Sequence, residues 1–224
     1  MKTITIDFVR HGQTIFNTMD KLQGWADSPL TANGIATADQ VGQLLKNTHY
    51  QSYHSSDLKR AIDTAKHIIQ PNRFLQAEPE QHEDFREVFF GSYEGLDFHQ
   101  AWIEVGEHQQ LGCRTQAEII QKYSFDAARD AMHAADPRHL SEDGATFSSR
   151  VDRGIQELLT EAHDGDRLLV VTHGTLIRSL VLRYGPDFDA LTNFPVNGGI
   201  TTLEAQAVDE HQFSGKITAY NRQD

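Results

Sequence analysis

The stretch FVRHGQTIFN, residues 8–17, joins the end of an apolar run to a glycine turn. The segment before Arg10, TITIDFV, alternates polar and apolar side chains and is rich in β-branched residues, which is typical of a buried β-strand. Arg10 and His11 follow directly, so a guanidinium and an imidazole stand side by side where this strand ends. Either the pair lies on an ordinary surface loop, or it belongs to an anion site that holds a nucleophile.

A second apolar run ends in the same way, in the stretch DRLLVVTHG at residues 166–174. His173 and Gly174 close this run, and a helical pattern, TLIRSLVLRY, begins at Thr175. In a sheet of parallel strands, ligands bind beyond the carboxyl ends of the strands. If the two strands are neighbours, His11 and His173 therefore come close to a single point.

Strands and helices alternate along the rest of the chain. This order predicts a three-layer α/β/α fold, in which helices cover both faces of a mostly parallel sheet. Residues 97–142 look helical but have a weak pattern, and we expect them to form a helical insertion in a single domain of residues 1–224. Periodicity places helices from Thr31 and over residues 57–71, 146–162 and 175–184, and strands over residues 3–9, 50–56, 73–77, 166–174, 198–208 and 215–221.

Composition and charge argue against several classes of protein. Of the 224 residues, 38% are apolar and 23% are charged, as in a globular domain. No apolar run approaches the roughly 20 residues that cross a bilayer, and the start MKTITIDFV is not typical of a signal peptide. The net charge of −12 argues against binding to nucleic acid or to an anionic membrane. The single cysteine, Cys113, excludes an internal disulfide, so we expect a cytoplasmic protein.

Positive charge gathers at the strand ends of this acidic chain, which favours a specific anion. Arg60 opens the helix after the strand at 50–56, and a guanidinium binds phosphate through two hydrogen bonds without losing its charge. The backbone N–H groups of Gly174 and Thr175, at a helix start, are further candidate donors. Glu87 lies in a turn-rich connection and is a candidate proton donor for a leaving alkoxide.

Two other kinds of site are disfavoured. A metal centre at His11 and His173 lacks a further ligand at the usual spacing, and Arg10 disfavours a nearby cation. No other ligand cluster with metal spacing is evident, so we expect neither a metal nor a cofactor. Cys113 beside Arg114 suggests a thiol phosphatase, but its loop lacks a glycine-rich phosphate cradle, so we expect this cysteine at the surface.

Four stretches together resemble the signatures of the histidine phosphatase superfamily, also called the phosphoglycerate mutase-like family. They are RHGQTIFN, SSDLKRAIDTA, REVFFGSYEG and VVTHGTLIRSL, and they occur in the family's order and at its spacings over nearly the whole chain. The resemblance implies a phosphohistidine mechanism with His11 as the nucleophile and Glu87 as the general acid. It assigns further residues to the phosphate pocket and the substrate loop: Arg10, Asn17, Gln23, Gly24, Arg60 and His173.

The resemblance leaves the reaction open. Mutases of the family carry a lysine and an adjacent arginine pair after the acid motif, whereas residues 95–116 contain no lysine and a single arginine, Arg114. We therefore favour a phosphatase of small phosphorylated metabolites, with a cofactor-dependent phosphoglycerate mutase as the alternative. A non-catalytic domain that binds a phosphorylated ligand is less favoured, because Arg10, His11 and Glu87 are all present. The sequence indicates neither the physiological substrate nor the oligomeric state.

Overall fold

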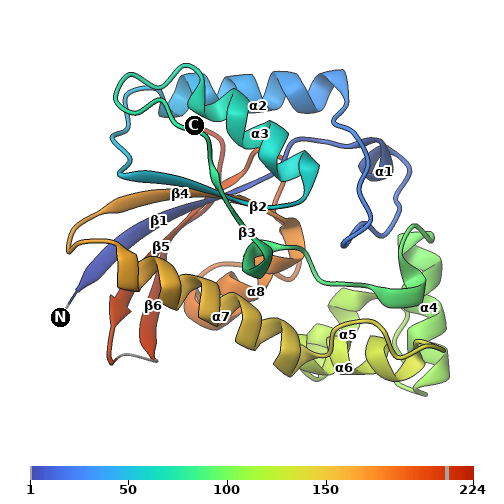
Figure 1. Ribbon diagram of the computed structural model, residues 1–224. Helices are drawn as coiled ribbons and strands as arrows, with labels where there is room; N and C mark the ends of the chain where they lie inside the picture. Colours follow the sequence, from blue (N-terminus) through green and yellow to red (C-terminus); the bar gives the residue numbers. More distant parts are fainter. Residues whose placement is uncertain (1, 210–211) are drawn as a thin grey trace.

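The computed structural model describes residues 2–209 and 212–224 (Figure 1). Within these residues, one mixed sheet contains six strands: β1 (Thr3–Arg10), β2 (Ser52–Ser56), β3 (Glu80–His82), β4 (Arg167–Thr172), β5 (Ile200–Ala207) and β6 (Phe213–Arg222). Their order across the sheet is β3-β2-β4-β1-β5-β6. The pairs β3–β2, β2–β4 and β4–β1 are parallel, and β5 runs antiparallel to both of its neighbours. The prediction of a mostly parallel sheet is therefore confirmed.

Helices cover both faces of this sheet. These are α2 (Ala32–Leu45), α3 (Lys59–Ile69), α7 (Gly144–Glu161) and α8 (Gly174–Tyr184). The short helix α1 (Ile15–Thr18) follows β1, and there are two 3₁₀ turns among the described residues, η1 (Glu83–Phe85) and η2 (Gly91–Tyr93). In Figure 1, α2 and α3 lie above the sheet, and α7 and α8 lie below it. Successive strand residues point to opposite faces, so Phe8 packs in the cluster with α7 and α8, and Val9 in the cluster with α2 and α3. The predicted three layers are thus confirmed. Among the described helices, none is long and apolar enough to span a membrane.

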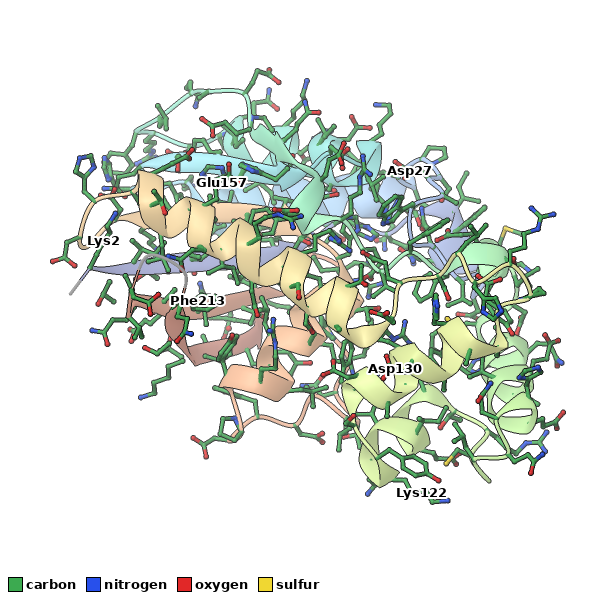
Figure 2. The ribbon with its side chains drawn as sticks, turned by 60° about the horizontal axis from the view of Figure 1, so that its bottom comes forward. Lys2, Asp27, Lys122, Asp130, Glu157 and Phe213 are labelled. Carbon is green, nitrogen blue, oxygen red and sulfur yellow. The ribbon has the colours of Figure 1, made fainter. Side chains whose placement is uncertain are left out.

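The predicted insertion at residues 97–142 contains three helices: α4 (Phe98–His108), α5 (Gln116–Lys122) and α6 (Phe125–Ala135). Each begins after a side chain that accepts a backbone N–H from the first turn, and these caps are Asp97, Thr115 and Ser124. Trp102 and Met132 are buried in the same cluster as Phe8, so the insertion and the sheet share one core. In Figure 2, the insertion with Lys122 lies at the opposite end of the molecule from Lys2.

The edge strand β3 differs from the prediction. We expected a strand at residues 73–77, but these residues form none, and the strand is instead Glu80–His82. The side-chain oxygen of Asn72 accepts hydrogen bonds from the backbone N–H groups of Phe74 and Leu75, so a local turn replaces a ladder there. The β3 sequence, EQH, is polar and has no apolar period, so its sequence carries no strand signal.

The expectation that Cys113 lies at the surface was wrong, since the residue is only 6% exposed. Cys113 packs in the core cluster with the insertion helices, and its carbonyl oxygen lies against Gly106. A Cβ at Gly106 would lie 2.0 Å from that oxygen, so glycine permits this close approach. Cys113 therefore behaves as a small core residue.

Candidate active site

The candidate active site is built around His11, which directly follows β1. The backbone N–H of His11 donates to the carbonyl of Thr172 at 2.9 Å, so the neighbouring strand β4 fixes its position. The ring nitrogen Nδ1 lies 2.8 Å from the carbonyl oxygen of Gly12. A carbonyl oxygen only accepts hydrogen bonds, so Nδ1 carries the proton and Nε2 keeps its lone pair.

The surroundings of His11 keep its ring uncharged. The residue is 4% exposed. Burial, followed by the positive charges of Arg60 and Arg10, holds the pKa of His11 well below its ordinary value. At neutral pH the ring is therefore a neutral imidazole, which is the form of histidine that acts as a nucleophile.

Arg60, in the first turn of α3, links His11 to the loop that follows α1. Its Nε donates to Nε2 of His11 at 3.3 Å. Its Nη2 donates to the carbonyl of Gly24 at 2.7 Å, and its Nη1 donates to the carbonyl of Ala26 and the carboxylate of Asp27, each at 3.1 Å. Arg60 therefore reaches the candidate nucleophile, while the loop engages its terminal nitrogens.

Arg10 lies at the end of β1 with part of its guanidinium unpaired. Its Nη1 donates to the carbonyl of Pro195 at 2.7 Å, and the guanidinium lies 5.2 Å from the ring centre of Phe194. Its Nε is buried without a hydrogen-bond partner among the described residues, so this N–H can donate to an incoming anion. A Cβ at Gly174 would lie 2.6 Å from the Phe194 ring and 3.1 Å from this Nε, so glycine leaves room for the Arg10 guanidinium beside the Phe194 ring.

His173 packs directly against His11 from the start of α8. The centres of the two rings are 5.2 Å apart. Burial and then the charge of Arg60 hold the pKa of His173 well below its ordinary value. Neither ring nitrogen of His173 has a hydrogen-bond partner within residues 2–209 and 212–224. The two strand-end histidines are thus brought together, as neutral rings in a cluster with two arginines.

Glu87 lies at the N-terminus of α8. Its carboxylate accepts hydrogen bonds from the backbone N–H groups of Thr175 at 2.9 Å, Leu176 at 3.2 Å and Val88 at 3.0 Å. The N–H of Thr175, which we expected to face a phosphate, is therefore directed at a carboxylate here. Glu87 is 6% exposed and lines the same cavity as Arg10. A carboxyl group in this place can exchange a proton with a molecule bound in the cavity.

Arg150 of α7 positions the backbone that carries Glu87. Its guanidinium donates to the carbonyls of Asp84 at 2.9 Å, Arg86 at 3.0 Å and Glu87 at 3.3 Å. It also forms an ion pair with Glu142 at 2.8 Å. Sequence reasoning missed Arg150, because backbone carbonyls are its main partners and every residue type supplies one.

Glu94 anchors the loop around Gly24 and was also missed. Its carboxylate oxygens accept hydrogen bonds of 3.0–3.1 Å from four backbone N–H groups, those of Gly24, Trp25, Ala26 and Phe90. A Cβ at Gly24 would lie 2.2 Å from one of these oxygens, so only glycine fits. Burial raises the pKa of Glu94, and the N–H groups oppose this shift. Glu94 does not line the cavity, which separates it from Glu87.

The other predicted substrate residues lie near His11. Gln23 accepts a hydrogen bond from the hydroxyl of Thr14 at 2.6 Å, and Asn17 accepts one from the backbone N–H of Thr14 at 3.1 Å. Both residues line the cavity. Asn197 lines it too, and its amide donates to the carbonyl of His11 at 2.9 Å. No sequence pattern pointed to Asn197, which lies in a loop far along the chain.

The cavity has a volume of about 520 Å³ and extends from Arg10 and His11 toward the insertion. Lys21, Arg114 and Arg178 bring positive charge to its wall. The Arg178 guanidinium is held by its own partners, including the carbonyls of Ala190 and Leu191. In the described part of the chain, neither Lys21 nor Arg114 has a side-chain hydrogen bond or ion pair. Two cations without side-chain hydrogen bonds in the described chain therefore line the cavity beyond the histidine pair, together with the carboxylate of Asp20, and their charges also act on Asp97 and Glu118.

Comparisons with known proteins identify the family of this chain. The family model of the histidine phosphatase superfamily (branch 1) matches residues 6–111 and 103–213. A metal-independent phosphoserine phosphatase from Arabidopsis thaliana is 32% identical over 183 residues, which cover 80% of this chain and 67% of that protein. A 2,3-bisphosphoglycerate-dependent phosphoglycerate mutase from Maricaulis maris (strain MCS10) is 28% identical over 187 residues, which cover 77% and 76% of the two chains.

The fold of a solved relative agrees as well. The crystal structure of phosphoglycerate mutase from Bacillus anthracis str. Sterne superposes with a TM-score of 0.84 at 31% identity, and the match covers 97% of this chain and 93% of that one. The family match extends over most of the chain and includes both strand-end histidines. The chain therefore belongs to the histidine phosphatase superfamily.

Proposed function

We propose that this chain hydrolyses small phosphomonoesters through a phosphohistidine formed on His11. The hydrogen bond from Nδ1 of His11 to the carbonyl of Gly12 carries the proposal, because it leaves the lone pair on Nε2. Arg60 lies beside this nitrogen, and Arg10 lines the adjoining cavity with an unpartnered Nε among the described residues. A neutral nucleophile between two guanidinium groups suits attack on an anionic phosphoryl group.

In the first step, Nε2 of His11 attacks the phosphorus atom while the bond from phosphorus to the ester oxygen breaks. Glu87, in its protonated form, gives its proton to the departing oxygen, which leaves as an alcohol. Arg10 donates to the phosphoryl oxygens, where charge must be stabilised during transfer. The Nδ1–H of His11 keeps its hydrogen bond to the carbonyl of Gly12, so the ring keeps its orientation.

In the second step, water attacks the phosphorus atom and Glu87 accepts its proton, which releases inorganic phosphate and restores neutral His11. The same carboxyl group serves both steps, because the proton it gives in the first step leaves it ready to accept one in the second. Three backbone N–H groups hold this carboxyl group in place at the start of α8.

The outer cavity favours substrates that carry a second acidic group. Lys21 and Arg114 line it, and neither has a salt bridge within 4.0 Å in the described chain. The aromatic side chains of Phe98 and Trp102 form an apolar part of the cavity wall. A cavity of about 520 Å³ suits a small phosphorylated metabolite.

A phosphoglycerate mutase activity is the second candidate function. The relatives from Maricaulis maris and Bacillus anthracis are named as mutases, and the unpaired Lys21 and Arg114 would suit a bisphosphorylated acid. The Arabidopsis thaliana relative, in contrast, is named as a phosphatase. The two reactions differ in the acceptor of the phosphoryl group on His11, which is water in one and a second substrate oxygen in the other.

Two assays on the same protein separate these functions. The first measures phosphate released from phosphoserine, 3-phosphoglycerate and p-nitrophenyl phosphate. The second measures 2-phosphoglycerate formed from 3-phosphoglycerate in the presence of a trace of 2,3-bisphosphoglycerate. We expect phosphate release to be the faster reaction. Interconversion of the two phosphoglycerates that outpaces phosphate release would assign the mutase reaction instead.

A variant tests the nucleophile itself. We expect His11→Ala to abolish turnover and labelling by a radioactive phosphomonoester, while His49→Ala, which removes an exposed histidine, retains both. An acid-labile, base-stable phosphate label that persists in His11→Ala would place the intermediate on another residue and overturn the assignment.

A further inference from the structure

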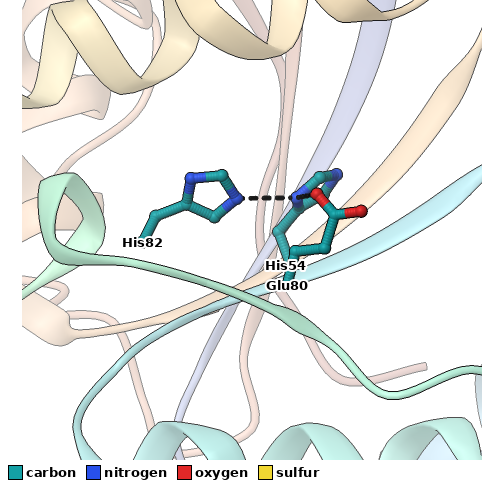
Figure 3. A group of neighbouring side chains, drawn as sticks. All are labelled: His54, Glu80 and His82. Carbon is teal, nitrogen blue, oxygen red and sulfur yellow. Dashed lines mark hydrogen bonds and ion pairs between the residues drawn. The ribbon is translucent and has the colours of Figure 1, made fainter.

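We propose that His54, Glu80 and His82 bind a divalent cation of the zinc class at the β3 edge of the sheet (Figure 3). His54 lies in β2, and Glu80 and His82 begin and end β3. The parallel register pairs His54 with Glu80 and Ser56 with His82, and residues two apart along a strand share a face. The three side chains therefore project from one face of the sheet. None of the three lines the cavity of the proposed phosphatase.

The spacing of the ligand atoms suits a single ion. Nδ1 of His54 lies 3.0 Å from Nε2 of His82 and 3.6 Å from Oε2 of Glu80. All three ligand atoms lie within 4.8 Å of one another. Ligands about 2.0–2.1 Å from a tetrahedral zinc ion are roughly 3.3–3.4 Å apart. The separations of 3.0 and 3.6 Å bracket this value, so small side-chain rotations close the site around an ion.

The outer ring nitrogens face oxygen acceptors. Nε2 of His54 lies 2.7 Å from Oγ of Ser52, and Nδ1 of His82 lies 3.9 Å from a carboxylate oxygen of Glu157 in α7. A histidine that ligates a metal through one nitrogen donates its other N–H to such an oxygen, which fixes its tautomer. Without metal, one of the two facing nitrogens carries the proton of their hydrogen bond. The ion displaces this proton to solvent, and the outer nitrogen of the same ring takes up a proton from solvent.

Access and charge also favour a cation. A second cavity, of about 320 Å³, opens beside the cluster and is lined by His54 and Glu80 together with Glu161 and Asp166. Neither Lys nor Arg occurs among the described residues of its lining. The side chains of His54, His82 and Glu80 are 3%, 14% and 64% exposed. An ion here would lie between a buried imidazole and solvent, so water can complete its coordination.

The ligand types select the kind of metal. Two imidazoles and one carboxylate suit Zn²⁺, whereas Mg²⁺ and Ca²⁺ take oxygen ligands. The ion would tie β3, an edge strand of three residues, to β2. Since a ligand that binds only the folded chain stabilises it, zinc should raise the melting temperature.

The test is a zinc titration of tag-free protein against a chromophoric chelator, with thermal unfolding measured in parallel. We expect the native sequence to bind one equivalent and to melt at a higher temperature with zinc. We expect His82→Gln to weaken binding at least about tenfold and to remove the thermal shift. His67→Ala removes a partly exposed histidine that contacts Asp39, and this matched control should bind zinc within about twofold of the native sequence.

The remaining variants exclude other sources of binding. Glu80→Gln changes a mostly exposed side chain, so it provides a second test if His82→Gln fails to fold by circular dichroism. It should weaken zinc binding severalfold. Zinc that is lost in His11→Ala but retained in His82→Gln would lie at the His11–His173 pair, which would overturn the proposal. The absence of zinc binding by the native sequence would overturn it too, and would leave a hydrogen bond between His54 and His82.

Discussion

Replacing Glu94 with glutamine tests whether this carboxylate anchors the substrate loop or supplies the catalytic proton. Each of its two oxygens accepts two backbone N–H groups, and the four donors are Gly24, Trp25, Ala26 and Phe90. Glutamine keeps the shape of the side chain but replaces one oxygen with an NH₂ group. That group faces two N–H donors and can accept a hydrogen bond from neither.

We expect Glu94→Gln to lower the free energy of unfolding by about 2–4 kcal/mol. Hydrogen bonds to a charged group contribute about 1.5–3 kcal/mol each, and the variant loses two of them and weakens the other two. The raised pKa of Glu94 reflects the cost of burying its charge, and neutral glutamine avoids that cost. This term offsets part of the loss, so the net effect lies well below the sum of four bonds.

The loop also holds Arg60, through the carbonyls of Gly24 and Ala26, so its displacement should lower kcat. Urea unfolding, and turnover between pH 5 and 8 of phosphoserine, an alkyl phosphate whose leaving group needs a proton, measure both effects, with Glu107→Gln at an exposed position of α4 as the matched control. We expect a lower kcat with a pH profile of unchanged shape. A stability within about 0.5 kcal/mol of the native sequence, together with a lost alkaline limb in the profile, would instead identify Glu94 as the proton donor.

Four further outcomes can be measured. Glu87→Gln should lower kcat on alkyl phosphates by about 10²–10⁴-fold. The same variant should slow the phosphorylation burst with p-nitrophenyl phosphate by a smaller factor, because the p-nitrophenolate leaving group needs no proton. Gly24→Ala should lower the urea midpoint and kcat together, since its Cβ would lie 2.2 Å from Glu94. EDTA should leave kcat unchanged, because arginines neutralise the phosphoryl charge. The free energy of unfolding should fall as the pH drops below about 6.5, because three buried histidines have lowered pKa values in the folded chain: His11, His54 (pKa about 4) and His173. The unfolded chain binds protons that these histidines exclude when folded, so each can contribute a loss of up to about 1.4 kcal/mol per pH unit. Melting temperatures at pH 7.5 and 5.5 measure the loss.

The histidine pair could be predicted from the sequence because both of its signals are local. An apolar run that ends in a histidine and a glycine occurs twice, and each run is long enough to form a buried strand. The register of β1 and β4 then pairs Arg10 with Thr172, so the residues that follow the two strands must meet. Local pattern and general sheet geometry together were sufficient to bring His11 and His173 to one point.

The supports of the site could not be predicted, because their partners are backbone groups. Arg150 donates to the carbonyls of Asp84, Arg86 and Glu87, and Glu94 accepts from the N–H groups around Gly24. Such contacts depend on the path of a loop, which periodicity does not specify. The same limit applies to Thr175, whose N–H was correctly expected at a helix start but donates to Glu87 rather than facing the cavity.

The cluster on β3 was hidden for a different reason, since its members have no common local pattern. His54 and His82 are 28 residues apart, and only the pairing of two short, polar strands brings them together. The register also pairs His54 with Val170, so this imidazole lies on the face of the sheet that α7 covers. An apolar side chain at this position would need no hydrogen-bond partner, whereas a buried imidazole does. An imidazole there is unfavourable for folding unless its nitrogens are engaged, and both of them are, by Ser52 and by His82. The buried pair is therefore satisfied in the folded chain, and each ring would bind the proposed ion through the nitrogen that now faces the other ring.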